Sequence, residues 1–353
     1  MKIAVLYNSA DEGGFLKDDI KYVEDAIANA GRLVNRFNDS GNHARLIEIT
    51  RKNLTRQLID VKKWVDVVFN LTEAVGLGLV LEIIGKLEEL DIPFAGASEY
   101  GHKLTSDKSL VKKVIREMNV PTPEWKIYTK HNFRERWPGR FPVIVKSTTE
   151  HGSMSIHQDS VTSNQKQMKD KVKELLDKYK GLPVMVEAYI DGREINSTVI
   201  GSYEWARCLP LSEMVFEGSY KRGTKWPIYT YEAKYNYHTV DFDDAPARLV
   251  NWLTPKEMKL IENISLSVCE ATECFDYART DIRFDLKSRT PYMVDLNSYP
   301  CLLEDTKYDT IGISRSALGW DFNKLIMEIA KSGIRRYQKY HNIQRGEDQA
   351  YAI

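Results

Sequence analysis

The chain has 353 residues, in which 50 Lys and Arg side chains balance 50 Asp and Glu, and 42% of the residues are hydrophobic. At roughly 100–200 residues per domain, this length predicts two or three domains. Zero net charge removes the electrostatic reason to expect nucleic acid or an anionic membrane as a partner. Four cysteines without a Cys-x-x-Cys pair are too few for a disulfide scaffold and do not suggest a zinc site.

Targeting signals are not evident in the sequence. The apolar run at residues 3–7 is shorter than the core of a secretory signal, and no small-residue cleavage site follows it. No stretch approaches the roughly 18–20 apolar residues of a membrane span. We therefore expect a cytoplasmic protein without a membrane partner.

Strand and helix patterns alternate in the first part of the chain. Buried-strand patterns lie at residues 3–7, 45–49, 65–70 and 92–96, and helical spacing of apolar residues lies at 20–31, 54–62 and 79–90. Gly31 is expected to end the first helix. Such alternation is typical of a parallel sheet with crossover helices, so we predict an N-terminal α/β domain over residues 1–103.

Two further units are predicted after residue 103. A small central unit over 104–186 combines helices at 107–119 and 163–179 with strands at 141–146 and 183–187. A larger, mainly antiparallel unit over 187–340 has strands at 193–201, 279–286 and 291–296 and helices at 255–274 and 322–338. Residues 341–353 are expected to form a polar, frayed tail.

The predicted hairpin carries the most informative polar residues. Arg279 and Asp281 are two positions apart on one strand, so their side chains share a face of the sheet. Asp295 and Asn297 repeat this spacing on the partner strand. Carboxylate and amide oxygens suit magnesium, and a guanidinium suits a phosphoryl group or an oxyanion. Taken alone, the hairpin fits a solvent-exposed polar face at least as well.

Other polar residues suit a nucleotide. Lys108 opens a helix, and Lys146 ends an apolar strand just before the small, polar loop 147–155. Hydroxyls and backbone N–H groups of this loop could close over phosphates. Glu187 and Glu194 stand where carboxylates could accept from adenine and ribose, although exposed glutamates would look the same. The P-loop and dinucleotide-binding glycine motifs are both absent.

The order of these segments resembles the ATP-grasp ligases, and among them the D-alanine–D-alanine ligase family. The resemblance covers roughly residues 1–330. The matching segments are residues 67–70 (Val-Val-Phe-Asn), 92–96 (Ile-Pro-Phe-Ala-Gly), Lys108, 121–123 (Pro-Thr-Pro), Lys146, the loop 147–155, 187–194, 231–235 (Tyr-Glu-Ala-Lys-Tyr), 279–281 (Arg-Thr-Asp) and 295–300.

The resemblance implies an ATP-grasp fold of the α/β (α+β) class and an ATP-dependent carboxylate–amine ligase. In such enzymes ATP phosphorylates a carboxylate, and an amine then attacks the acyl-phosphate, giving a dipeptide or related amide with ADP and phosphate. It also implies two magnesium ions, for which manganese could substitute, small-molecule carboxylate and amine substrates such as amino acids or short peptides, and a homodimer.

The resemblance further implies roles for individual residues. Lys108, Lys146 and Lys234 match phosphate-binding positions. Glu187, Ala188, Tyr189, Ile190 and Glu194 match positions that hold adenine and ribose. Asp281, Asp295 and Asn297 match magnesium ligands. The candidate catalytic residues are Arg279, for the acyl-phosphate and the tetrahedral intermediate, with Ser153, Tyr235 and Glu12, the last for the ammonium of the first substrate.

Departures from the family pattern concern the substrates. Residues 71–76 replace the family's His-Gly and Gly-Glu-Asp-Gly motifs, and His151 is inserted in the phosphate loop. Cys301 stands where the D-alanine ligases have a glycine beside the reacting centre. Glu304 and Asp305 follow it and are expected to repel a free carboxylate, although Thr306 could still supply a hydroxyl. We therefore expect an acceptor that is larger, cationic or without a free carboxylate beside its amine.

Other functions remain open at this point. The chain could be a carboxylase or small-molecule kinase of the same superfamily, or a D-alanine–D-alanine ligase proper in cell-wall synthesis. A binding protein that has lost catalysis is less consistent with the sequence, since Arg279, Asp281, Asp295 and Asn297 are all present.

Overall fold

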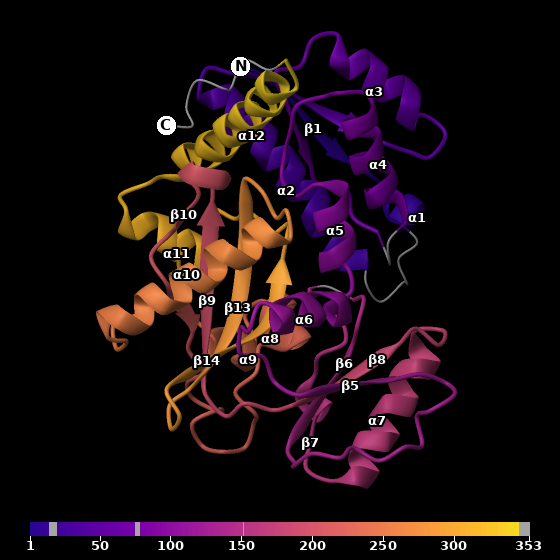
Figure 1. Cartoon of the computed structure of the whole chain (residues 1–353), viewed down its shortest axis with the longest axis vertical. Helices are drawn as coiled ribbons and strands as arrows, with labels where there is room; N and C mark the ends of the chain where they lie inside the picture. The colour runs from indigo at the N-terminus through magenta and orange to yellow at the C-terminus, as the bar shows by residue number, and fades with distance from the viewer. Residues whose placement is uncertain (14–19, 75–77, 151, 346–353) are drawn as a thin grey trace.

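The computed structural model describes residues 1–13, 20–74, 78–150 and 152–345, with backbone alone for residues 20–22 and 342–345 (Figure 1). Within them, three β-sheets follow one another along the chain. The first is parallel, with strand order β2-β1-β3-β4. Its strands are β1 (Lys2–Tyr7), β2 (His43–Glu48), β3 (Val67–Asn70) and β4 (Phe94–Ala95).

Helices connect the strands of this first sheet. They are α1 (Ala10–Gly13), α2 (Ile20–Asp39), α3 (Leu54–Lys62), α4 (Gly78–Glu89) and, after β4, α5 (Glu99–Thr105). The prediction that Gly31 ends the first helix is wrong, because α2 continues through it to Asp39. A glycine costs about 1 kcal/mol in a helix interior. Burial of Leu33 and Phe37 beyond it outweighs that cost.

The central unit contains a small antiparallel sheet of order β5-β8-β6-β7. Helix α7 packs on it through Met168, Val172 and Leu175, which are buried with Val143 and Val145 of the sheet. The elements are α6 (Lys108–Glu117), β5 (Trp125–Tyr128), β6 (Val143–Ser147), β7 (Val161–Thr162), α7 (Gln165–Lys178) and β8 (Val184–Ala188).

The third sheet is antiparallel, with order β12-β11-β9-β13-β14 and β10 paired to β9. Its strands are β9 (Arg193–Ile200), β10 (Arg207–Cys208), β11 (Ser212–Met214), β12 (Ala247–Leu249), β13 (Tyr277–Asp285) and β14 (Thr290–Asn297). The helices of this unit are α8 (Tyr231–Tyr235), α9 (Val240–Asp243), α10 (Pro255–Ala271), α11 (Thr310–Ala317) and α12 (Phe322–Arg345).

These sheets confirm the predicted fold class, a parallel N-terminal sheet followed by antiparallel sheets. The expected frayed tail is wrong at its start, because α12 extends to Arg345, and residues 346–353 lie outside the described residues. No helix within the described residues combines the length and the apolar character that a bilayer span requires.

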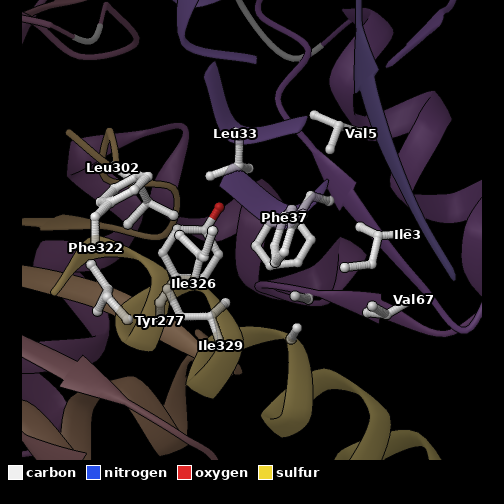
Figure 2. Packing of buried hydrophobic residues seen from close by; sticks show 14 of the residues in the cluster. Ile3, Val5, Leu33, Phe37, Val67, Tyr277, Leu302, Phe322, Ile326 and Ile329 are labelled. Carbon is white, nitrogen blue, oxygen red and sulfur yellow. The ribbon is translucent and has the colours of Figure 1, made fainter. Parts of the chain in front are cut away.

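The first and third units share a hydrophobic core. Figure 2 shows Leu33 and Phe37 of α2 on one side and Ile326 and Ile329 of α12 on the other, with Tyr277 of β13 between them. Full burial of one such side chain contributes about 1.5–3 kcal/mol. Helix α2 is therefore held firmly against the C-terminal unit, which matters for the site described next.

Candidate active site

A cavity of about 1040 Å³ is lined by residues of all three units. Ligand pockets typically measure about 300–1,000 Å³, so this one has room for more than one small ligand. Every residue that the sequence predicted for the site lines it, except Glu12. They are Lys108, Lys146, Ser153, Glu187, Ala188, Tyr189, Ile190, Glu194, Lys234, Tyr235, Arg279, Asp281, Asp295 and Asn297.

The β13–β14 hairpin supplies the densest group of charges. Arg279 pairs with Asn297 in register, and Asp281 pairs with Asp295, so the four side chains lie together. The Arg279 guanidinium donates to both carboxylate oxygens of Asp281, at 2.7 and 3.0 Å. Asn196 Nδ2, on the neighbouring strand β9, donates to Asp281 Oδ1 at 2.6 Å. The Asp281 carboxylate is thus fixed from two sides.

Burial acts to lower the pKa of Arg279, but Asp281, Asp309 and Asp295 outweigh it and the pKa is raised. Arg279 therefore stays charged at any working pH. Lys108 adds a second cation, because its Nζ lies 3.7 Å from Asp295 Oδ2 and donates to the Glu150 carbonyl at 2.8 Å. Positive charge thus flanks the acidic residues of the hairpin.

The oxygen donors of the hairpin fit a divalent cation that is shared with a phosphate. The described residues contain no ready-made group of three His, Cys, Asp or Glu side chains for a metal. Magnesium usually needs one or two carboxylates and completes its shell with water and phosphate oxygens. Asp281 and Asp295 meet that need from opposite strands. The Asn297 Oδ1 accepts from Tyr299 N at 2.9 Å and keeps a second lone pair.

Two of the nucleotide-type residues, Lys146 and Glu187, form a buried charge cluster with Lys112. Glu187 Oε2 is 3.0 Å from Lys112 Nζ and 3.3 Å from Lys146 Nζ. Burial lowers the pKa of Lys112 to about 8, although Glu187 opposes it. Glu187 therefore serves first to neutralise two lysines. Lys112 could not be recognised from the sequence, because a lysine on an amphipathic helix normally belongs to the solvated face.

Arg283 was also missed, and it holds the segment between Glu187 and Glu194. Its guanidinium donates to the Ile190 carbonyl at 3.2 Å and to the Tyr189 hydroxyl at 3.1 Å. Its Nη1 lies 3.3 Å from Glu194 Oε2. Burial raises the pKa of Glu194, and Arg283 counters part of that effect. The alternation Arg279, Asp281, Arg283 along β13 was the sequence signal that could have revealed it.

The polar loop 147–155 forms hydrogen bonds with the segment that carries Lys234 and Tyr235. Ser153 has a positive φ of 63°, and its hydroxyl donates to the Tyr229 carbonyl at 3.1 Å. The backbone N–H of Tyr231 donates to the Ile156 carbonyl at 2.9 Å. These contacts place a hydroxyl, an ammonium and a phenol along one wall of the cavity. His151 lies outside the described residues.

Glu12 is the one predicted site residue that the structure does not bring to the cavity. It lies on α1, and its carboxylate accepts from the Arg51 backbone N–H at 3.1 Å. Glu73 lines the cavity instead. Asn8 holds the Glu73 backbone with two hydrogen bonds, at 2.8 and 2.9 Å. The sequence could not place Glu12, because the position of a carboxylate in a predicted loop depends on contacts with distant parts of the chain.

The two acids after Cys301, which were expected to repel a free carboxylate, both line the cavity and both have hydrogen-bond partners. Glu304 makes a bidentate ion pair with Arg36, with both distances 2.6 Å. Asp305 Oδ1 accepts from the backbone N–H groups of Lys307 and Tyr308, each at 2.6 Å. Arg36 therefore compensates the charge of Glu304. Asp305 has backbone partners without an opposite charge, so the expected repulsion of a free carboxylate is weakened at Glu304 and stays a prediction at Asp305.

Asp309 gives the cavity a testable pH dependence. It caps α11 by accepting from Gly312 N at 2.7 Å. Burial raises its pKa from 3.8 to about 6, although the Gly312 N–H and Arg279 oppose this. Its contribution to stability is therefore present below pH 4 and lost as pH rises to 6. Asp309→Asn keeps a capping oxygen but does not titrate. Its unfolding free energy relative to that of wild type should therefore rise by roughly 2–3 kcal/mol as the pH increases from 4 to 7.

Urea unfolding of both proteins between pH 3 and 7 measures this difference. Glu257→Gln is the control of opposite sign. Arg289 and Thr254 lower the pKa of Glu257 from 4.5 to about 2, so its contribution is lost as pH falls through that range. A pH-independent difference between Asp309→Asn and wild type would contradict the assignment.

Comparison with known proteins places the site in a family context. A family model described as "D-ala D-ala ligase C-terminus" matches residues 114–331. The chain is 32% identical over 271 residues to the uncharacterised protein y4sG of Sinorhizobium fredii, covering 76% of this chain and 75% of that protein. It is 25% identical over 244 residues to a D-alanine–D-alanine ligase of Aquifex aeolicus, covering 69% of this chain and 74% of that enzyme.

Solved structures show the same fold. The D-alanine–D-alanine ligase of Bacillus anthracis complexed with ATP superimposes with a TM-score of 0.69 at 20% identity. The match covers 96% of this chain and 99% of that one. A ligase structure from Coxiella burnetii matches with the same TM-score over 98% of this chain, at 17% identity.

Proposed function

The chain belongs to the D-alanine–D-alanine ligase family of ATP-dependent ligases, and from this premise we propose that it joins a carboxylate to an amine through an acyl-phosphate. One observation carries the proposal. A single cavity brings together the cations Lys108 and Lys146, the acids Asp281 and Asp295, and the guanidinium of Arg279. Phosphoryl transfer depends mostly on positioning and charge neutralisation, and this set supplies both.

We assign the nucleotide to the side of the cavity formed by β6, β8 and the start of β9. Lys108 and Lys146 would contact the phosphates of ATP. Glu194 would accept from the ribose, and the segment that Arg283 braces would pack against adenine. Magnesium or manganese, held by Asp281, Asp295 and Asn297, would supply charge neutralisation at the phosphates.

The reacting groups would lie beside Arg279. Its guanidinium can donate to the acyl-phosphate and then to the oxyanion formed when the amine attacks. Burial lowers the pKa of Lys234, with Arg279 adding to the effect, so its ammonium is poorly hydrated and well suited to pair with an anion. Burial raises the pKa of Tyr235 well above its usual value, so the phenol stays neutral and acts as a hydrogen-bond donor. The Ser153 hydroxyl, already tied to the Tyr229 carbonyl, would orient the loop beside them.

The substrates that we propose are amino acids or short peptides. D-Alanine is a second candidate for both positions, because the relative from Aquifex aeolicus is a D-alanine–D-alanine ligase. A screen of ADP release over pairs of amino acids, short peptides and diamines, with ATP and magnesium, tests the proposal. Mass spectrometry should find a new amide in the pairs that release ADP.

Two results of this screen would contradict the proposal. ADP release that depends on bicarbonate would indicate a carboxylase. A stable phosphorylated product without an amide would indicate a kinase. Efficient formation of D-alanyl-D-alanine, faster than any other pair, would assign the chain to the second candidate substrate.

A further inference from the structure

A polar stripe on α2 forms part of the cavity wall. The stripe consists of Asp25, Asn29, Arg32 and Arg36, all of which line the cavity. Positions three or four apart lie on one side of a helix. The adjacent side of α2 is anchored by Leu33 and Phe37 in the core shared with the C-terminal unit (Figure 2). The stripe therefore faces the cavity from a rigid element.

The members of the stripe on either side of Arg32 contact the C-terminal unit. Each contact joins a polar side chain on α2 to residue 237 or to the segment 301–304. The contacts are Tyr237 hydroxyl to Asp25 Oδ2 at 3.3 Å, Asn29 Nδ2 to Cys301 Sγ at 3.6 Å, and the bidentate pair of Arg36 with Glu304 at 2.6 Å.

Arg32 differs from its neighbours. It is exposed, and across residues 1–13, 20–74, 78–150 and 152–345 its guanidinium makes no hydrogen bond or ion pair. The charge of Arg32 affects Glu304 and Tyr237, two of the groups that the stripe contacts. A hydrogen bond from Arg36 lowers the pKa of Glu304, and Arg32 adds to this. Burial raises the pKa of Tyr237, and Arg32 opposes it. An available guanidinium thus stands between neighbours that each have a hydrogen-bond partner.

A ligation leaves some substrate groups unreacted. The donor's carboxylate is consumed in forming the amide, so any second carboxylate, on the acceptor or on a donor side chain, is carried into the product unchanged. Glu304 is already neutralised by Arg36, so it does not oppose such an anion. Arginine binds carboxylates through two parallel hydrogen bonds, which no lysine reproduces.

We propose that Arg32 binds a non-reacting carboxylate of the substrates and so selects substrates that carry one. This inference rests on the proposed ligase function and deepens it. The substrate class is an amino acid or peptide with a free carboxylate apart from the one that is activated. Arg32 acts as a specificity-determining residue, and the nucleotide is bound elsewhere, by Lys108 and Lys146.

The experiment compares wild type with Arg32→Met and Arg32→Lys in the full chain. Isothermal titration with amino acids and dipeptides, and with their carboxamides, is run in the presence of magnesium and a non-hydrolysable ATP analogue. A hydrogen bond to a charged group is worth about 1.5–3 kcal/mol, so Arg32→Met should weaken binding of the carboxylate forms roughly 10- to 150-fold. The carboxamides should bind both proteins alike, and Arg32→Lys should fall between.

The control is Arg56→Met, an exposed arginine on α3 that does not line the cavity. It should leave all affinities unchanged, and the affinity for the ATP analogue should not change in any variant. Equal losses for carboxylates and carboxamides, or no loss, would overturn the assignment of Arg32. The assignment would also be overturned if the wild-type protein bound none of the amino acids and dipeptides tested. Absence of ADP and amide in the substrate screen, with the Arg32 effect on binding intact, would instead reject only the ligation reaction.

Discussion

Asp295→Ala is expected to reduce kcat by about a thousand-fold. Asp295 lies opposite Asp281 in the hairpin register, and its Oδ2 is 3.7 Å from Lys108 Nζ. A metal ion at this position is worth several kcal/mol of transition-state charge stabilisation, and each 1.36 kcal/mol is tenfold in rate. Losing one ligand of the pair should therefore remove most of the activity.

Kinetics at several magnesium concentrations separate this role from a structural one. Asp295→Asn keeps an oxygen but not the charge, so raised magnesium should restore part of its activity, and should not do so for Asp295→Ala. The matched control is Asp170→Ala on α7, whose carboxylate is 70% exposed and pairs with Lys166 at 3.7 Å. It should behave as wild type. Unchanged kcat in Asp295→Ala would remove the hairpin from the proposed metal site.

The sequence was most informative where a pattern extends over many residues. The helix at 54–62 and the long amphipathic helices were predicted because their apolar spacing repeats several times. Short elements were missed, among them β11 (Ser212–Met214), α8 (Tyr231–Tyr235) and β12 (Ala247–Leu249), since three to five residues contain no period. Their positions follow from pairing in the tertiary structure, which local sequence does not encode.

The candidate site likewise contains residues that a local pattern predicts and residues that only the folded structure reveals. Strand spacing predicts that Arg279 and Asp281 share a face, as Asp295 and Asn297 do. The metal role proposed for these residues came only from the order of the motifs.

Lys112 and Arg283 could not be predicted, because their role is to compensate other charges in the folded protein. The role that we propose for Arg32 could not be predicted from the sequence, for a related reason. Its meaning depends on which of its neighbours already have partners, and those partners lie more than 200 residues away in the chain.

Arg279→Lys is the second variant from which we expect a large effect. Lysine keeps the charge but cannot make two parallel hydrogen bonds, so the fork that now spans both oxygens of Asp281 is lost. Removing one preorganised donor from an oxyanion site typically costs about 10²–10³ in kcat. We expect a loss of that size in kcat, with the KM for ATP changed by no more than roughly threefold, because in the proposed reaction the guanidinium stabilises charge that develops only in the transition state.

Arg289→Lys is the matched control, because Arg289 also forms a bidentate pair, with Glu257, at the turn of the same hairpin. Its side chain is 43% exposed and lies outside the cavity lining, so its loss should leave kcat unchanged. Both variants change an arginine of the same hairpin to lysine. A difference between them therefore reflects the position of the arginine and not the type of substitution. Equal activity in Arg279→Lys and wild type would show that the Arg279 fork serves only to hold Asp281. A loss confined to Arg279→Lys, with thermal unfolding unchanged, places the fork at the reacting atoms.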